Sequence, residues 1–137
     1  MEEQQGSEAT IKMIADYMES GFLDNIVDMF RHDPSFYPLL GRLLGDERSR
    51  VRIGAVALVE TLKEEDSGNV LLAIPGIARL LRDPNATIRG DAAYLLGIIG
   101  HKEALPFLMD AADDDHDLVR ETIAEAIAEI SQVKGPR

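Results

Sequence analysis

Apolar residues recur at helical spacing in three stretches of the chain. In each stretch they occupy positions i, i+4, i+7, i+8 and i+11, which lie on one face of an α-helix. The first set is Val51, Ala55, Leu58, Val59 and Leu62, the second is Ile88, Ala92, Leu95, Leu96 and Ile99, and the third is Val119, Ile123, Ala126, Ile127 and Ile130. The pattern predicts three amphipathic helices, each with one buried face.

A polar pattern accompanies the apolar one and indicates that the three stretches are internal repeats. In every copy an Asp is followed five residues later by Val or Ile and six residues later by Arg. The pairs are Asp46 and Arg52, Asp83 and Arg89, and Asp114 and Arg120. The copies start 37 and 31 residues apart, so each unit has room for two short helices and tight turns.

An apolar segment precedes each predicted helix and supplies its antiparallel partner. These segments cover residues 36–44, 74–81 and 104–112. Pro75 and Pro106 fall where the first turn of such a helix would lie, a position at which the missing N–H costs nothing. The repeated unit is therefore predicted to be a pair of antiparallel helices.

Residues 1–34 precede the repeats and carry two further helical patterns, broken near Ser20 and Gly21. The apolar residues of these patterns are Ile11, Ile14, Met18, Phe22, Ile26, Met29 and Phe30. We expect residues 1–34 to form an N-terminal cap or a degenerate repeat, because the end of a repeat array otherwise exposes apolar surface. Residues 35–137 would then hold three repeats of one all-α domain with about eight helices.

The segment from Asp83 through Ile88 and Arg89 to Gly100 resembles the HEAT-like repeats named after phycobilisome lyases. The resemblance covers roughly residues 35–131. Units of this length are typical of the compact prokaryotic variety of the repeat. It implies a right-handed α-solenoid whose second helices line a concave face, where proteins of this kind commonly hold another protein. It also leaves open a lyase-like accessory subunit that handles a tetrapyrrole, or a metal-dependent HEAT-like enzyme.

Charge and composition narrow the set of partners. The formal net charge of −11 has the wrong sign for a nucleic-acid partner, since affinity for phosphates depends on Lys and Arg. The chain lacks Cys, and no apolar run approaches the ~18 residues that a membrane span needs. We therefore expect a cytoplasmic protein with neither a nucleic-acid nor a membrane partner, and its oligomeric state remains open.

The sequence contains no recognisable catalytic arrangement, so we expect no enzyme, no cofactor and no metal. The deoxyhypusine hydroxylases, which are HEAT-like, carry a di-iron centre on repeated adjacent His-Glu pairs. His32, His101 and His116 are not part of such pairs and occupy different phases of their units. The repeated Asp and Arg residues are interpreted as structural, because every unit has them and an Asp favours the start of a helix.

The remaining candidates are positions on the second helices that are not needed for the core and that differ between units. We expect the partner-binding residues to be Asp91, Tyr94, Ile98, Glu125 and Glu129. An apolar centre beside carboxylates suits a protein or peptide partner with a basic or mixed surface. An alternative surface is the arginine group at the unit junctions, which consists of Arg42, Arg48, Arg50, Arg79 and Arg82.

Overall fold

The computed structural model describes residues 2–132, which form an all-α solenoid, and its side chains from residue 8 onward. The described residues form eight α-helices and four short 3-10 helices, and contain no strand. The N-terminal helices are α1 (Glu2–Glu19) and α2 (Leu23–His32). The first repeat comprises η1 (Pro34–Leu39), α3 (Leu40–Leu44) and α4 (Ser49–Glu65); the second comprises η2 (Asn69–Ala73), α5 (Ile74–Arg79), η3 (Leu80–Arg82) and α6 (Ala86–Ile99); the third comprises η4 (Lys102–Ala104), α7 (Leu105–Asp110) and α8 (Asp117–Gln132).

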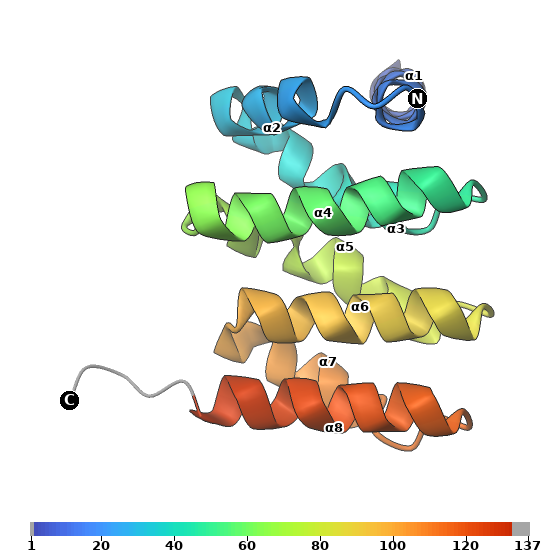
Figure 1. Cartoon of the computed structure of the whole chain (residues 1–137), viewed down its shortest axis with the longest axis vertical. Coiled ribbons are helices and arrows are strands. Elements are labelled where there is room, and N and C mark those ends of the chain that lie inside the picture. Colours follow the sequence, from blue (N-terminus) through green and yellow to red (C-terminus); the bar gives the residue numbers. More distant parts are fainter. Residues whose placement is uncertain (1, 133–137) are drawn as a thin grey trace.

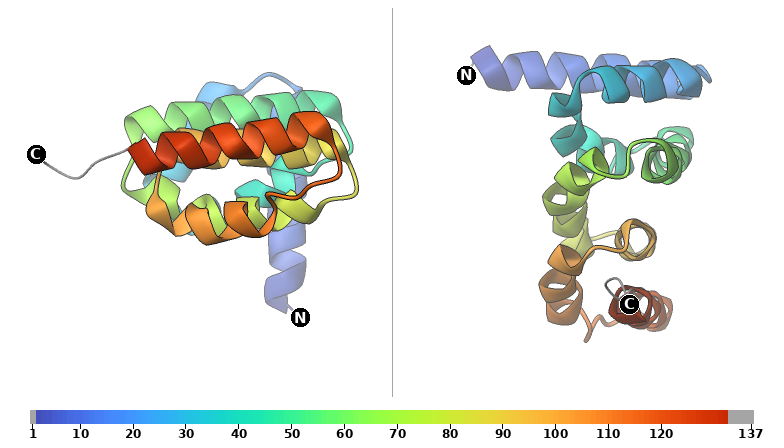
Figure 2. Two further views of the ribbon diagram at one scale, coloured as in Figure 1. Left: turned by 90° about the horizontal axis from the view of Figure 1, so that it is seen from below. Right: turned by 90° about the vertical axis from the view of Figure 1, so that its left-hand side faces the viewer.

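The helices lie in two layers. The long second helices α4, α6 and α8 are stacked side by side, and the shorter first helices form the layer behind them (Figures 1 and 2). The apolar positions that predicted the second helices are all buried except Ile127, which is half-buried. The expected all-α solenoid of antiparallel helix pairs is thus confirmed.

The first helices are less regular than the second ones. Each begins with a 3-10 segment before a short α-helical piece. Pro38 lies inside η1, and α3 begins only at Leu40, because a proline cannot donate the N–H that an α-helical bond requires. Pro75 and Pro106 occupy the first turns of α5 and α7, as the sequence predicts.

Two glycine contacts bring neighbouring units close together. A Cβ atom built on Gly41 of α3 would lie 2.5 Å from the carbonyl oxygen of Gly76 in α5. A Cβ atom on Gly97 of α6 would lie 3.1 Å from both Cα and Cβ of Ala126 in α8. Helix α6 approaches α8 closely because neither residue has a large side chain at this contact.

Helix α1 covers the N-terminal end of the stack and runs crosswise to α4, α6 and α8 (Figure 2). Its buried residue Met18 rests on Gly54 of α4, where an added Cβ would meet the Met18 side chain at 2.4 Å. Arg42 of α3 reaches Glu8 of α1 at 2.7 Å. The assignment of residues 1–34 as a cap or a degenerate repeat stays a prediction. Residue 1 and residues 133–137, at the two ends of the predicted segments, lie outside the described part of the chain.

No helix in the described residues is long and apolar enough to cross a membrane.

Candidate partner-binding groove

The repeated Asp residues form the same turn before each second helix. Each carboxylate accepts a hydrogen bond from the backbone N–H two residues later: Asp46 from Arg48 at 2.8 Å, Asp83 from Asn85 at 2.8 Å, and Asp114 from His116 at 2.9 Å. The Arg six residues after each Asp then donates from Nη1 to the carbonyl oxygen of that Asp. The pairs are Arg52 to Asp46 at 2.6 Å, Arg89 to Asp83 at 2.9 Å, and Arg120 to Asp114 at 2.6 Å.

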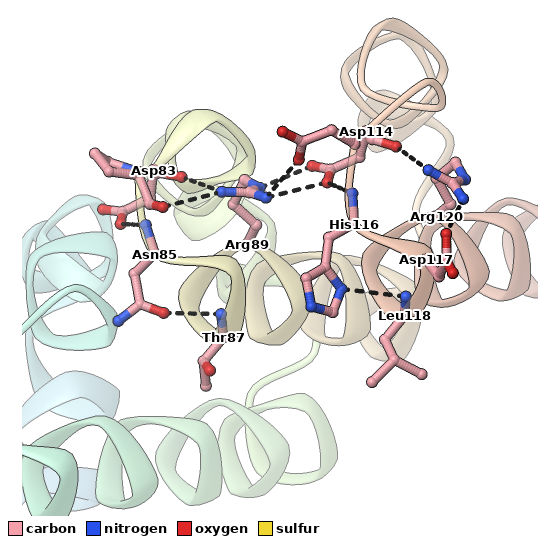
Figure 3. A network of polar contacts seen from close by, with 11 residues as sticks. Asp83, Asn85, Thr87, Arg89, Asp114, His116, Asp117, Leu118 and Arg120 are labelled. Carbon is pink, nitrogen blue, oxygen red and sulfur yellow. Dashed lines mark hydrogen bonds and ion pairs between the residues drawn. The ribbon is translucent and has the colours of Figure 1, made fainter.

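The residue two positions after the Asp decides how the helix is capped. Asn85 accepts a hydrogen bond from the N–H of Thr87, and Nδ1 of His116 accepts one from the N–H of Leu118 (Figure 3). Each therefore satisfies one of the free N–H groups of a helix start. Arg48 stands at this position in the first unit and provides no side-chain cap. Its guanidinium instead contacts Asp16 and Glu19 of α1 at 3.0 and 3.1 Å.

One Arg also links two units. Arg89 donates from Nε and Nη2 to the carboxylate of Asp114 in the third unit, at 2.8 and 3.1 Å (Figure 3). These hydrogen bonds hold the pKa of Asp114 below its ordinary value, and the hydrogen bond from the N–H of His116 lowers it further. Burial alone would raise this pKa. We retain the stabilising role of the six repeated Asp and Arg residues as a prediction.

A groove with a volume of about 460 Å³ lies between α6 and α8. Its lining residues are Ala86, Thr87, Gly90, Asp91, Tyr94, His116, Leu118, Val119, Thr122 and Glu125. Three of the residues expected to bind a partner, Asp91, Tyr94 and Glu125, are therefore brought together here. The volume falls within the range usual for small-molecule sites, about 300–1,000 Å³.

The other two expected residues lie outside the groove lining. Ile98 is half-buried near the end of α6, whereas Glu129 of α8 is exposed. An oxygen of Glu129 lies 3.1 Å from the position of a Cβ atom on Gly97, so this side chain covers the glycine contact between the helices. Both residues flank the groove toward the C-terminal ends of α6 and α8.

Sequence reasoning missed three side chains that shape this surface. Glu60 of α4 accepts a hydrogen bond from the hydroxyl of Tyr94 at 2.7 Å, which raises the pKa of Tyr94. Thr87 and Leu118 line the groove, and Leu118 is 65% exposed. Thr87 and Leu118 each lie four residues after the repeated Asp of their unit. A comparison of the residues at this position in successive units could have identified them.

Asp91 is the only carboxylate among the groove-lining residues on α6, and it is half-buried. Burial raises its pKa, and the positive charge of Arg52 on α4 opposes that shift. Asp91 makes no hydrogen bond or ion pair with any residue that the structure describes. Arg52 directs Nη1 to the carbonyl oxygens of Asp46 and Glu47, at 2.6 and 2.9 Å.

Two members of the arginine group at the unit junctions already have acidic partners. Arg42 binds Glu8, and Arg48 binds Asp46 together with the acids of α1. The remaining members, Arg50, Arg79 and Arg82, are exposed and make no ion pair within residues 8–132. The alternative binding surface stays a prediction, with Arg50, Arg79 and Arg82 as its unpaired members among the described residues.

The three histidines do not fit a metal centre built on histidine and acidic ligands. Nδ1 of His32 donates to the carbonyl oxygen of Asp28 at 2.8 Å, whereas Nδ1 of His101 and of His116 accept backbone N–H groups. Within the described ranges, no three His, Asp or Glu side chains gather in a way that could hold a metal ion.

The fold is that of stacked antiparallel helix pairs with a repeated turn before each second helix. Residues 72–128 match the family model described as HEAT repeats, which covers the second unit and most of the third. The HEAT-like character that the sequence indicates is confirmed for these residues. Their assignment to the phycobilisome lyase type has no support from this match.

Curated relatives carry the name of an enzyme. The chain is 28% identical to deoxyhypusine hydroxylase of Aspergillus clavatus over 81 residues, which cover 58% of this chain and 24% of the relative. The hydroxylase of Aspergillus oryzae gives the same values, and that of Mycosarcoma maydis is 26% identical over 107 residues, or 75% of this chain and 30% of the relative. The matched regions thus span about a quarter to a third of the length of these relatives.

This similarity corrects the expectation that the protein is not an enzyme, because the proteins that it resembles are named as one. The expectation rested on the absence of a catalytic motif. A helical repeat framework can serve binding and catalysis alike, so the absence of a motif did not exclude a relationship to an enzyme.

Proposed function

We propose that the protein is a HEAT-like partner-binding module that holds a protein or peptide on the concave face formed by the second helices α4, α6 and α8. The groove between α6 and α8, with Tyr94 in its lining, is the observation that carries this proposal. A partner with a basic or mixed surface is favoured, because Asp91, Glu125 and the neighbouring Glu60 and Glu129 are acidic.

Tyr94 is proposed as the central contact. It is 43% exposed, and the hydrogen bond to Glu60 holds its hydroxyl in place. A fixed aromatic ring with a polar tip offers a large contact area and loses little conformational freedom on binding. Tyr94 therefore combines the position and the chemistry of an energetically dominant interface residue.

Affinity capture from the native lysate tests this proposal, with wild type compared with two tyrosine variants. Tyr94→Ala should weaken binding of a captured partner by about thirtyfold. Tyr17→Ala is the matched control, because Tyr17 on α1 is 45% exposed and lies away from the groove. Equal loss of binding in both variants, or in neither, would place the binding surface elsewhere.

The names of the relatives supply a second candidate, a contribution to hydroxylase chemistry on a deoxyhypusine substrate. The similarity over 58–75% of this chain favours it. Conversion of a deoxyhypusine-containing substrate by the purified protein, followed by mass spectrometry, tests it directly. The phycobilisome lyase type, with a tetrapyrrole as ligand, is supported only by the residues from Asp83 to Gly100.

A further inference from the structure

The ionised side chains that line the groove between α6 and α8 are all acidic. Asp91 on one wall and Glu125 on the other are its carboxylates, and its lining contains no Lys or Arg. Its one basic lining residue, His116, uses Nδ1 to accept the N–H of Leu118. The lining therefore supplies negative charge and no Lys or Arg. The charge of Arg52 on α4 acts on Asp91, but its Nη1 donates to the carbonyl oxygens of Asp46 and Glu47.

Asp91 differs from the repeated Asp residues in having no hydrogen-bond partner among the described residues. Asp83 and Asp114 both bind backbone N–H groups, and Asp114 also binds Arg89. Removal of a carboxylate from water without a partner is unfavourable, and a cation that arrives from outside would remove this cost. The partly buried position of Asp91 thus favours an ionic partner over water.

Two exposed side chains give the groove apolar surface beside its carboxylates. Leu118 of α8 is 65% exposed and Tyr94 of α6 is 43% exposed, and both line the groove. A long cationic side chain has an aliphatic stem and a charged end, so it can cover apolar surface while its charge reaches a carboxylate. Arginine and lysine are the side chains with this combination.

We propose that this groove binds one arginine or lysine side chain of a partner peptide, with the cation between Asp91 and Glu125 and the stem against Leu118 and Tyr94. The inference rests on the proposed partner-binding function and adds the residue class that the groove selects. Asp91 would be the residue that determines specificity, because the first and third units have Gly54 and Thr122 at the equivalent positions.

Two capped peptides test the proposal: acetyl-Gly-Leu-Arg-Leu-Gly-amide and the same peptide with citrulline in place of arginine. Citrulline keeps the shape of arginine and lacks its charge. Titration followed by NMR shifts of Leu118 and Thr122 should show at least about tenfold tighter binding of the arginine peptide at low salt. Asp91→Asn should abolish this preference, whereas Asp110→Asn, outside the groove, should retain it.

Equal affinities for the two peptides, no saturable shift at Leu118 and Thr122, or a preference that survives in Asp91→Asn would overturn the proposal. The capture experiment separates this failure from that of the general function. If Tyr94→Ala still loses the captured partner, the binding surface stands and only the selection of a cationic side chain is wrong. If Tyr94→Ala retains the partner as well, both proposals fail.

Discussion

Arg89 of the second repeat and Asp114 of the third are joined by two hydrogen bonds, from Nε at 2.8 Å and from Nη2 at 3.1 Å. Both side chains are largely shielded from solvent, with 13% and 7% of their surfaces exposed. Arg89 also donates to the carbonyl oxygens of Asp83 and Pro84 in its own unit. One guanidinium therefore joins the turns that precede α6 and α8.

Replacement of Arg89 by Ala should lower the midpoint of thermal unfolding by about 5 °C, because it leaves the shielded Asp114 carboxylate without its cation. Arg42→Ala is the matched control, since Arg42 also joins two elements but is 52% exposed in its pair with Glu8. That variant should change the midpoint by no more than about 2 °C. Equal shifts in the two variants would contradict the structural role of Arg89.

The acid dependence of stability should differ in sign between Asp114 and Asp91. The pKa of Asp114 is lowered from 3.8, chiefly by Arg89, so its ionised form stabilises the fold above pH 3.8. This contribution is lost as the pH falls through the lowered pKa. Asp114→Asn should therefore be less stable than wild type at pH 7, and the difference should shrink below about pH 4.

The pKa of Asp91 is shifted in the opposite direction to that of Asp114. Burial raises its pKa from 3.8, so protonation favours the fold, and this advantage is lost as the pH rises through the raised pKa. Asp91→Asn should be more stable than wild type at pH 7 and equal to it below about pH 4. Urea unfolding at several pH values measures both variants, and a difference of the same sign for both would contradict the assignment.

The contact between α6 and α8 should tolerate no large side chain at Gly97. Gly97→Leu should lower the free energy of unfolding by about 1–2 kcal/mol, because the added atoms meet Ala126 and Glu129. Gly90→Ala, on the same helix, should raise it by about 0.5–1 kcal/mol, since a Cβ atom there meets nothing within 4 Å and alanine favours the helix. Destabilisation by both substitutions would show that backbone conformation, not close packing, explains the two glycines.

Glu125 should act mainly on the rate of partner association. It is exposed on α8 and lines the groove, so its charge attracts a basic partner before contact is made. Glu125→Lys should slow association with a captured partner by about tenfold at low salt and change dissociation less. Surface plasmon resonance at two salt concentrations measures this effect, with Glu103→Lys as an exposed control away from the groove. An unchanged association rate for Glu125→Lys would remove Glu125 from the binding surface.

The sequence by itself determined the helix pairs, because a buried helix face requires apolar residues at fixed spacing and the repeated Asp and Arg positions mark the register. It also placed Asp91, Tyr94 and Glu125 on one surface, since the same columns recur in stacked units. The relationship to an enzyme could not be read from it, because one repeat framework serves different functions.

Only the tertiary structure decided which residues of neighbouring units meet. The pairing of Arg89 with Asp114 and of Tyr94 with Glu60 depends on how far α4, α6 and α8 are offset from one another. That offset follows from close contacts such as that of Gly97 with Ala126. The residue pattern of a single helix does not reveal such contacts between helices. The groove has the same origin: its walls belong to two helices, and their separation is a property of the packed units rather than of either segment.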